Sequence, residues 1–334
     1  MHTFLLRHKS YLGVFLGGTI VGVGVGMLNP VSDYADAIAN INITSEKSTG
    51  DALTSPLLDC EVNGNTAGSG LIPFGDELNR LTEDIVSSGK ASSVAVYYRD
   101  LNNGPWLGVN ESDAYLPASL LKVPVMIAYF KAAETDPAIL SQKIRFENPI
   151  EAPDGGVQTI QPSQNLEVGK EYTAEDLIER TIMYSDNQAV QLLYQHIDPK
   201  FIFDVYHRIG VDSKAIEGPG AVLSPREYSA FFRVLYNASY LNREMSEKAL
   251  GILTRVEQKQ GLVSGVPAGT AVAHKFGEAG YQDDLLQYHD CGIVYHPKRH
   301  YLLCIMTQGK DVKKLETTIQ DLSRFVWEEV DTQL

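Results

Sequence analysis

Ser119 and Lys122 are the first pair of residues whose types and spacing can do covalent chemistry. They follow Pro117-Ala118 and open an apolar stretch with a helical pattern. On a helix, residues i and i+3 share a face, so the serine hydroxyl and the lysine amine can meet. A serine hydroxyl is a weak nucleophile that needs a base beside it, and a lysine serves when burial lowers its pKa. The spacing alone is common, because a capping serine followed by a solvated lysine gives the same pattern.

Two further groups of polar residues follow along the chain. Ser185–Asn187 reads Ser-Asp-Asn and separates two helical patterns, where short polar side chains also act as ordinary caps. His274–Gly277 ends a strand pattern, and its lysine is placed to hold a substrate carboxylate. The glycine there would let a substrate backbone lie against the strand. Each group alone is weak, and only the combination indicates a catalytic site.

The elements that must position these groups can be read from apolar periodicity. Helical patterns fill the middle of the chain, whereas strands and one helix stand at each end. Thr173 and Ser224-Pro225 have the residue types of helix starts. This order predicts an α/β (α+β) fold in which both chain ends form one antiparallel sheet, flanked by terminal helices, with an inserted helical subdomain. Helices are expected at 74–88, 119–133, 173–184, 187–197, 224–236, 246–259 and 311–330, and strands at 92–101, 106–109, 271–276, 291–296 and 301–307.

Taken together and in this order, the three groups resemble the SxxK, SDN and KTG set of class A β-lactamases and penicillin-binding proteins. The resemblance extends from about Phe74 to Val330 and includes the order of elements. It implies the β-lactamase/transpeptidase-like fold, in agreement with the packing predicted above.

The resemblance also implies roles for individual residues. Ser119 would be the acylated nucleophile and Lys122 its general base. Ser185 would relay a proton to the leaving group, Asn187 would hydrogen-bond the substrate amide, and Lys275 would bind the substrate carboxylate.

The oxyanion hole and the strand beside it follow from the same resemblance. The backbone N–H groups of Ser119 and Glu278 would form the oxyanion hole. Phe276 and Gly277 would border the substrate, but Phe276 stands where the family has Thr or Ser. Because that hydroxyl helps to bind the substrate carboxylate, the head group of the substrate is expected to differ.

A second departure concerns hydrolysis of the acyl-enzyme. The class A motif Glu-x-x-Leu-Asn, whose glutamate activates water, has no counterpart here. Glu217 is the one carboxylate near the expected place and is more simply a solvated loop residue. His274 and His289 lie near the Lys275 strand. The acidic stretch 283–290, which includes His289, looks like an inserted surface loop, with lining of the cleft as the alternative.

These observations leave three hypotheses of function. The leading one is a β-lactamase-family serine hydrolase that acts through an acyl-serine intermediate on a β-lactam or related amide. The second is a peptidoglycan D,D-carboxypeptidase or transpeptidase that binds penicillin, since it needs no deacylating glutamate. The third is a non-catalytic binding protein on the same fold. The partner is then a small β-lactam or a peptidoglycan-like peptide, and no metal or organic cofactor is implied.

Composition excludes some other classes. The 28 Lys and Arg against 42 Asp and Glu give a net charge of −14, which argues against a nucleic-acid partner. The three cysteines have no metal-ligand spacing. A hairpin turning at Pro297–His300 would place Cys291 and Cys304 diagonally on one face, so two buried thiols are expected and Cys60 is left in a polar segment.

The N-terminal part has a different character. Residues 11–28 are uncharged, apolar and about long enough to span a bilayer. Because Arg7 and Lys9 precede them, residues 1–10 are expected to be cytoplasmic and the rest of the chain extracytoplasmic. A cleaved signal peptide is the alternative to this membrane anchor. The polar residues 29–72 are expected to form a flexible linker to a hydrolase domain at 73–334.

Overall fold

The computed structural model describes residues 52–55, 74–102, 104–149, 160–211, 221–280 and 285–332. The expected membrane segment at 11–28, most of the expected linker, and Glu217 lie outside the described residues. Within the described part of the chain, no helix is long and apolar enough to cross a membrane.

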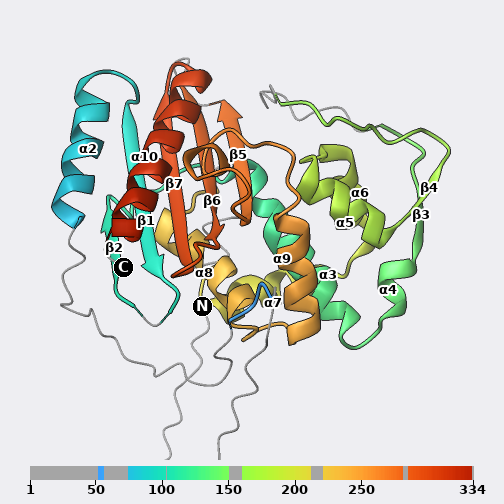
Figure 1. Cartoon of the computed structure of the whole chain (residues 1–334). Coiled ribbons are helices and arrows are strands. Elements are labelled where there is room, and N and C mark those ends of the chain that lie inside the picture. The colour runs from blue at the N-terminus through green and yellow to red at the C-terminus, as the bar shows by residue number, and fades with distance from the viewer. Residues whose placement is uncertain are drawn as a thin grey trace, which may run out of the picture. The chain divides into compact units, whose positions relative to one another are not determined.

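The described chain is built around a five-stranded antiparallel sheet with the order β2-β1-β7-β6-β5 (Figure 1). Strands from both ends of the chain meet in it, so the predicted α+β architecture is confirmed. The strands β6 and β7 are buried on both faces, which explains the nearly continuous apolar sequence of β7, whereas β6 also buries Gln287, His289 and Asp290. The strands are β1 Ser93–Asp100, β2 Trp106–Val109, β5 Val272–Gly280, β6 Leu286–Val294 and β7 Tyr301–Gly309.

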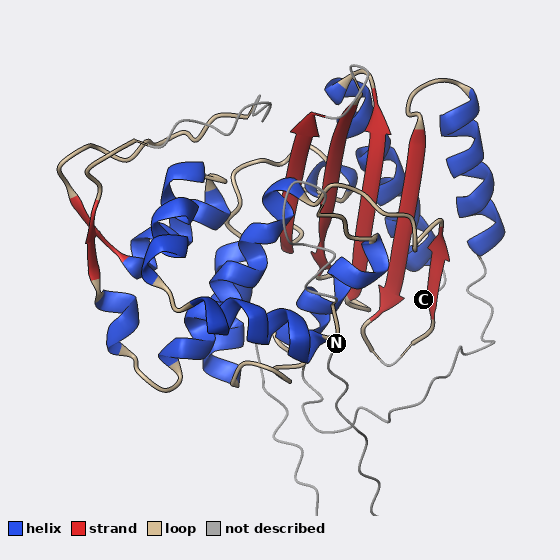
Figure 2. Ribbon diagram, turned by 180° about the vertical axis from the view of Figure 1, so that it is seen from behind, coloured by secondary structure: helices blue, strands red, loops and turns tan. Residues whose placement is uncertain are grey.

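Helices cover the sheet on both faces. The two terminal helices, α2 (Gly75–Ser87) and α10 (Val312–Thr332), lie together on one face (Figures 1 and 2). The rings of Phe74 and Phe325 pack edge to face. The helical subdomain lies between β2 and β5 in the sequence and contacts the sheet through α8, α9 and η1. Its helices are η1 Ala118–Leu121, α3 Lys122–Ala133, α4 Ala138–Ser141, α5 Ala174–Met183, α6 Asn187–His196, α7 Pro199–Ile209, α8 Pro225–Tyr236 and α9 Arg243–Leu253, with η3 Val263–Gly265 following.

Local capping explains several helix boundaries. The predicted caps at Thr173 and Ser224 are confirmed, and each forms a capping box with the carboxylate three residues later. The helix α9 begins earlier than predicted because the side chain of Asn242 caps it. The prediction missed α7 and a small sheet of β3 (Lys143–Arg145) with β4 (Glu171–Thr173).

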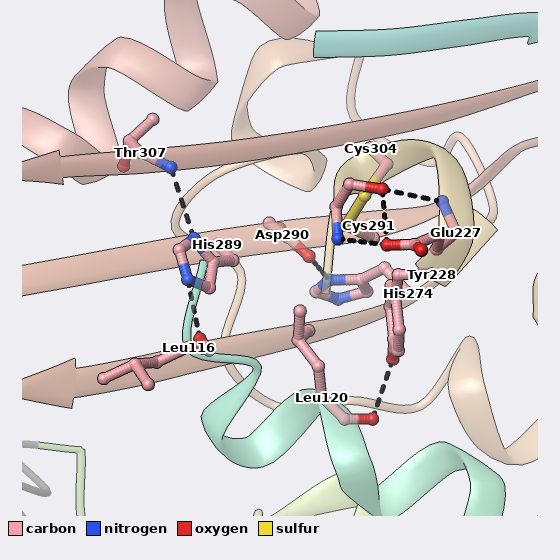
Figure 3. Close-up of a disulfide and its surroundings, with 11 residues drawn as sticks. Leu116, Leu120, Glu227, Tyr228, His274, His289, Asp290, Cys291, Cys304 and Thr307 are labelled. Carbon is pink, nitrogen blue, oxygen red and sulfur yellow. Dashed lines mark hydrogen bonds and ion pairs between the residues drawn. A yellow bond between two sulfur atoms is a disulfide. The ribbon is translucent and has the colours of Figure 1, made fainter. Parts of the chain in front are cut away.

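The expectation of two free thiols is wrong. Cys291 and Cys304 form a disulfide, and their Cα atoms lie 3.9 Å apart (Figure 3). The strands end at Val294 and Tyr301, so the turn is longer than the sequence suggested. That register places the two cysteines directly opposite each other rather than on a diagonal.

A short part of the expected linker is bound to the domain. In this docking segment, Ala52–Ser55, the backbone N–H groups of Leu53 and Thr54 donate to the carboxylate of Glu247 on α9, each at 2.9 Å. The hydroxyl of Thr54 donates to the same carboxylate at 2.5 Å. Tyr295 donates to the carbonyl of Leu53 at 2.9 Å, and Thr54 and Ser55 are buried. Leu53, Thr54 and Ser55 therefore differ from a free tether, because backbone polar groups of all three find partners on the domain.

Candidate active site

The expected nucleophile lies on a tight turn that leads into α3. Ser119 is half-buried and belongs to η1, which continues directly into the buried helix α3. Ala118, immediately before it, has a positive φ of 47°. Such a conformation is costly for a residue with a Cβ and persists only where the surroundings hold it. Here they do so through Leu120, which is fully buried and whose carbonyl accepts a hydrogen bond of 3.0 Å from Tyr228 on α8.

Lys122 connects the expected nucleophile to the Ser185–Asn187 turn. Its buried Nζ donates to Ser119 Oγ at 3.0 Å, to Ser185 Oγ at 3.0 Å and to Asn187 Oδ1 at 2.6 Å. It also donates to the carbonyl of Ser185 at 2.6 Å. Burial lowers the pKa of Lys122 to about 7, although the Asp186 carboxylate acts in the opposite direction. A large fraction of this amine is therefore neutral near pH 7 and able to take a proton.

The Ser185–Asn187 turn joins α5 to α6. Ser185 is buried with a positive φ of 56°, which points its hydroxyl at the two lysines. Asp186 caps α6 by accepting from the N–H groups of Gln188 and Ala189. The cap fixes the turn, so the hydroxyl on one side of Asp186 and the amide on the other both meet Lys122.

Lys275 reaches the same serine from the opposite wall. It lies on the edge strand β5, is fully buried, and donates from Nζ to Ser185 Oγ at 3.1 Å and to the carbonyl of Phe276 at 2.9 Å. The Phe276 ring lies over the amine, with its centroid 3.8 Å from Nζ. Burial and the nearby Lys122 hold the pKa of Lys275 well below its ordinary value.

Gly277 and Glu278 continue the same strand. A Cβ at Gly277 would lie 3.0 Å from the carbonyl oxygen of Pro117 and from the side chain of Leu120, so the glycine lets β5 close against the nucleophile turn. Sequence reasoning had explained this glycine by contact with substrate alone. The hydrogen bond and charge of Glu316 raise the pKa of Lys313 on α10, and the Glu278 carboxylate adds a smaller effect in the same direction. Only the backbone of Glu278 was expected to act at the site.

The two histidines near this strand are core residues. The prediction of a surface loop at 283–290 is wrong for residues 286–290, which belong to β6 between β5 and β7. His289 is fully buried, and burial lowers its pKa to about 4. Its Nε2 lies 3.1 Å from the carbonyl of Leu116, and Thr307 donates to its Nδ1 at 3.2 Å (Figure 3). The neutral ring thus ties β6 to the segment that leads into Ser119.

Sequence reasoning missed several residues that support the nucleophile turn. The side chain of Gln287 accepts from the N–H of Leu116 at 2.9 Å. Asp290 on β6 instead supports the Lys275 strand, because it lies 2.8 Å from His274 Nδ1 on β5 and accepts from the N–H of Leu262 at 3.0 Å. Such partners, which are distant in the sequence, carry no local signal of their own. Among the described residues, no group of three His, Cys, Asp or Glu could hold a metal ion.

The structure therefore brings together, at the junction of the sheet and the helical subdomain, Ser119, Lys122, Ser185, Asn187 and Lys275. This arrangement, on an antiparallel sheet with a C-terminal helix and a helical subdomain, is the β-lactamase fold.

The chain belongs to the β-lactamase enzyme family, a family of serine hydrolases, whose model matches residues 76–330. No curated protein sequence matches the chain.

Among solved structures, PBP-A is similar, with 22% sequence identity and a TM-score of 0.64 over 77% of this chain and 96% of that one. A class A β-lactamase from Mycobacterium abscessus is 22% identical, with a TM-score of 0.63 over 77% and 99% of the two chains. The TLA-3 extended-spectrum β-lactamase is 18% identical, with a TM-score of 0.66 over 77% and 99%. At these identities the likeness establishes the fold.

Proposed function

We propose that this protein is a serine hydrolase that acts through an acyl-serine intermediate on a β-lactam or related amide. The observation that carries the proposal is the Lys122 amine, which lies 3.0 Å from Ser119 Oγ and has a pKa of about 7. A nucleophile paired with a base of matched pKa is the requirement for attack on a carbonyl.

Acylation follows from the contacts described above. Lys122 takes the proton of Ser119 as Oγ forms a bond to the substrate carbonyl carbon. The negative charge that develops on the carbonyl oxygen would be held by the N–H groups of Ser119 and Glu278. Ser185 then passes a proton to the leaving nitrogen or oxygen as its bond to carbon breaks. Lys122 replaces that proton, since it contacts both hydroxyls. Attack by water on the acyl-serine would release the acid and restore Ser119.

A peptidoglycan D,D-peptidase or transpeptidase is the second candidate. The lack of a Glu-x-x-Leu-Asn motif favours it, because slow deacylation lets an acyl-enzyme persist or pass to an amine. The solved relatives include a variant of PBP-A as an acyl-enzyme complex with penicillin G. That relative supports acylation of this fold by a penicillin.

The two candidates differ in the fate of the adduct. The experiment is intact mass spectrometry of the full chain with penicillin G over time, beside Ser119→Ala and with an activated aryl ester as a second acyl donor. A Ser119-dependent adduct that decays as hydrolysed drug accumulates supports the β-lactamase. A persistent adduct supports the peptidase. Absence of Ser119-dependent acylation by either donor contradicts the proposal and favours the non-catalytic binder.

We also propose that the domain acts outside the cytoplasmic membrane, held by residues 11–28. The Cys291–Cys304 disulfide supports this location, because structural disulfides persist in oxidising compartments. Fractionation of cells that produce the full chain, with protease added to intact spheroplasts, tests it. Recovery of the chain in the cytosolic fraction would contradict it.

A further inference from the structure

Lys275 is a poor candidate for binding an anion, although it is a lysine in the active site. Its amine is fully buried, and its hydrogen bonds run to Ser185 Oγ and to the carbonyl of Phe276. The amine also lies against the face of the Phe276 ring, 3.8 Å from its centroid. An aromatic face carries partial negative charge, so it attracts the amine beneath and repels a carboxylate above.

The Phe276 ring is fixed in this position. Its side chain is 3% exposed, and the ring stacks on Tyr288 of β6 with the centroids 6.4 Å apart. Tyr288 is held in turn by its hydroxyl, which donates to the carbonyl of Gln260 at 3.0 Å. The ring cannot leave the amine without opening this packing, so the contact between Phe276 and Lys275 is a fixed part of the site.

The charges around the two lysines also disfavour the binding of a substrate carboxylate. Asp186 interacts electrostatically with Lys122, and Asp290 with Lys275. Burial lowers the pKa of Lys122 to about 7, so this amine carries less than its full positive charge near pH 7, and burial also lowers the pKa of Lys275. A carboxylate on the substrate would meet little positive charge here, and the two aspartates lie nearby.

From this geometry we infer that the site takes neutral acyl donors, namely esters or amides that bear no carboxylate next to the scissile bond. The Phe276 ring is the specificity-determining group. The inference rests on the proposed acyl-serine function and narrows it to neutral esters and amides. Penicillin G and D,D-peptides carry a carboxylate beside the scissile amide, so they are expected to acylate Ser119 more slowly than a neutral aryl ester does. Lys275 then serves as a proton-relay partner of Ser185 rather than as a carboxylate clamp.

The test uses two aryl phenylacetates that differ at one group of the leaving phenol. One carries a 3-carboxylate and the other its methyl ester. Attack by Ser119 releases either phenol, which takes the proton passed on by Ser185, and water then releases phenylacetic acid. Both rates of hydrolysis by the full chain are divided by the rates of uncatalysed hydrolysis, so the intrinsic reactivity of the phenols cancels.

The wild-type protein is expected to favour the methyl ester by about tenfold or more in kcat/KM. The reason is that the carboxylate of the other ester finds no charged hydrogen bond in the site to replace those it makes with water. Phe276→Thr restores a hydroxyl donor and should shift the ratio towards the carboxylate by about 10- to 100-fold. Phe276→Leu removes the ring without adding a donor and should not move the ratio towards the carboxylate as far as Phe276→Thr does.

Two results would overturn the inference. One is a wild-type ratio that favours the carboxylate, and the other is an equal ratio in the Thr and Leu variants. Hydrolysis of both esters at the rate of Ser119→Ala is a separate outcome that refutes the acyl-serine function itself. The two failures are therefore distinguishable.

Discussion

Two lysine amines meet at one serine hydroxyl in this site, and both are buried. The sequence indicates which residues are involved but not how strongly their surroundings bias the protonation states. Burial is what turns Lys122 from a surface cation into a base, because a charged amine loses its hydration there. Two predictions follow at the scale of single residues.

The first concerns the pH dependence of acylation. Lys122 must be neutral to accept the Ser119 proton, and its pKa is about 7. We expect kcat/KM with a neutral aryl ester to rise about tenfold per pH unit below that value and to level off above it. The pH–rate profile from pH 5 to 9 measures this. Lys131→Arg on the same helix should keep the profile, since Lys131 pairs with Glu134 outside the site. A flat profile would show that another group is the base.

The second prediction concerns how much the buried Lys122 amine lowers the free energy of unfolding. The pKa of Lys122 is lower in the folded protein than in the unfolded chain, so the unfolded chain binds more protons between about pH 7 and the ordinary lysine pKa. The contribution of Lys122 to the free energy of unfolding therefore rises with pH between about pH 7 and the ordinary lysine pKa. We expect Lys122→Met to abolish activity and to raise the unfolding free energy at pH 7 by about 2 kcal/mol. Urea unfolding at pH 7 and pH 10 measures this, and a gain no larger at pH 7 than at pH 10 would contradict it.

At the scale of elements, the disulfide joins the two central strands. Cys291 is in register with Lys275 on β5 and with Cys304 on β7. The closed loop has a sequence separation of 13, for which chain entropy gives about 3 kcal/mol of stabilisation. We expect dithiothreitol to lower the unfolding free energy of the wild type by about this amount.

A matched variant distinguishes the effect of breaking the disulfide from any other effect of dithiothreitol. Cys304→Ala should resemble the reduced wild type and should not respond further to dithiothreitol. Equal urea midpoints for the oxidised and reduced wild type would show that the bond does not stabilise the domain.

The docking segment Ala52–Ser55 leads to a further prediction at this scale. The Glu247 carboxylate accepts three hydrogen bonds from it, and a hydrogen bond to a charged group contributes up to about 1.5–3 kcal/mol net, less where water reaches it. Glu247→Ala should lower the unfolding free energy by about 1–2 kcal/mol and speed tryptic cleavage at Lys47. Glu244→Ala, on the same helix but exposed, is the control. Equal cleavage rates in both variants would contradict the docking.

The elements also show what sequence alone can predict. Periodicity located the sheet strands and most helices because each buries one patterned face. Periodicity failed where the pairing or burial of a residue is determined by segments distant in the sequence. The register of Cys291 with Cys304 depends on the turn after Val294, and the burial of His289 depends on strands β5 and β7 around it. Likewise, Ser119, Lys122 and Lys275 were identifiable by motif, but the Phe276 ring over the amine was not.

At the scale of the whole molecule, the net charge of −14 acts on the approach of substrate. A negative protein repels anions over roughly a Debye length, about 10 Å at 0.1 M salt. We expect kcat/KM for the carboxylate ester to rise about two- to threefold between 20 mM and 300 mM NaCl, whereas the neutral ester stays constant. Parallel salt titrations of the two esters measure this. An identical salt response of the two esters would show that salt acts on the stability of the protein and not on the approach of a charged substrate.

The docking segment also sets the route by which mechanical force would enter the domain. Tension applied from the N-terminal side would reach Glu247 on α9 and Tyr236 on α8 before it reached α2. In a single-molecule pulling experiment, the first rupture would break the hydrogen bonds of the docking segment to α8 and α9. The docking segment would thus detach under tension before the sheet that holds the active site unfolds.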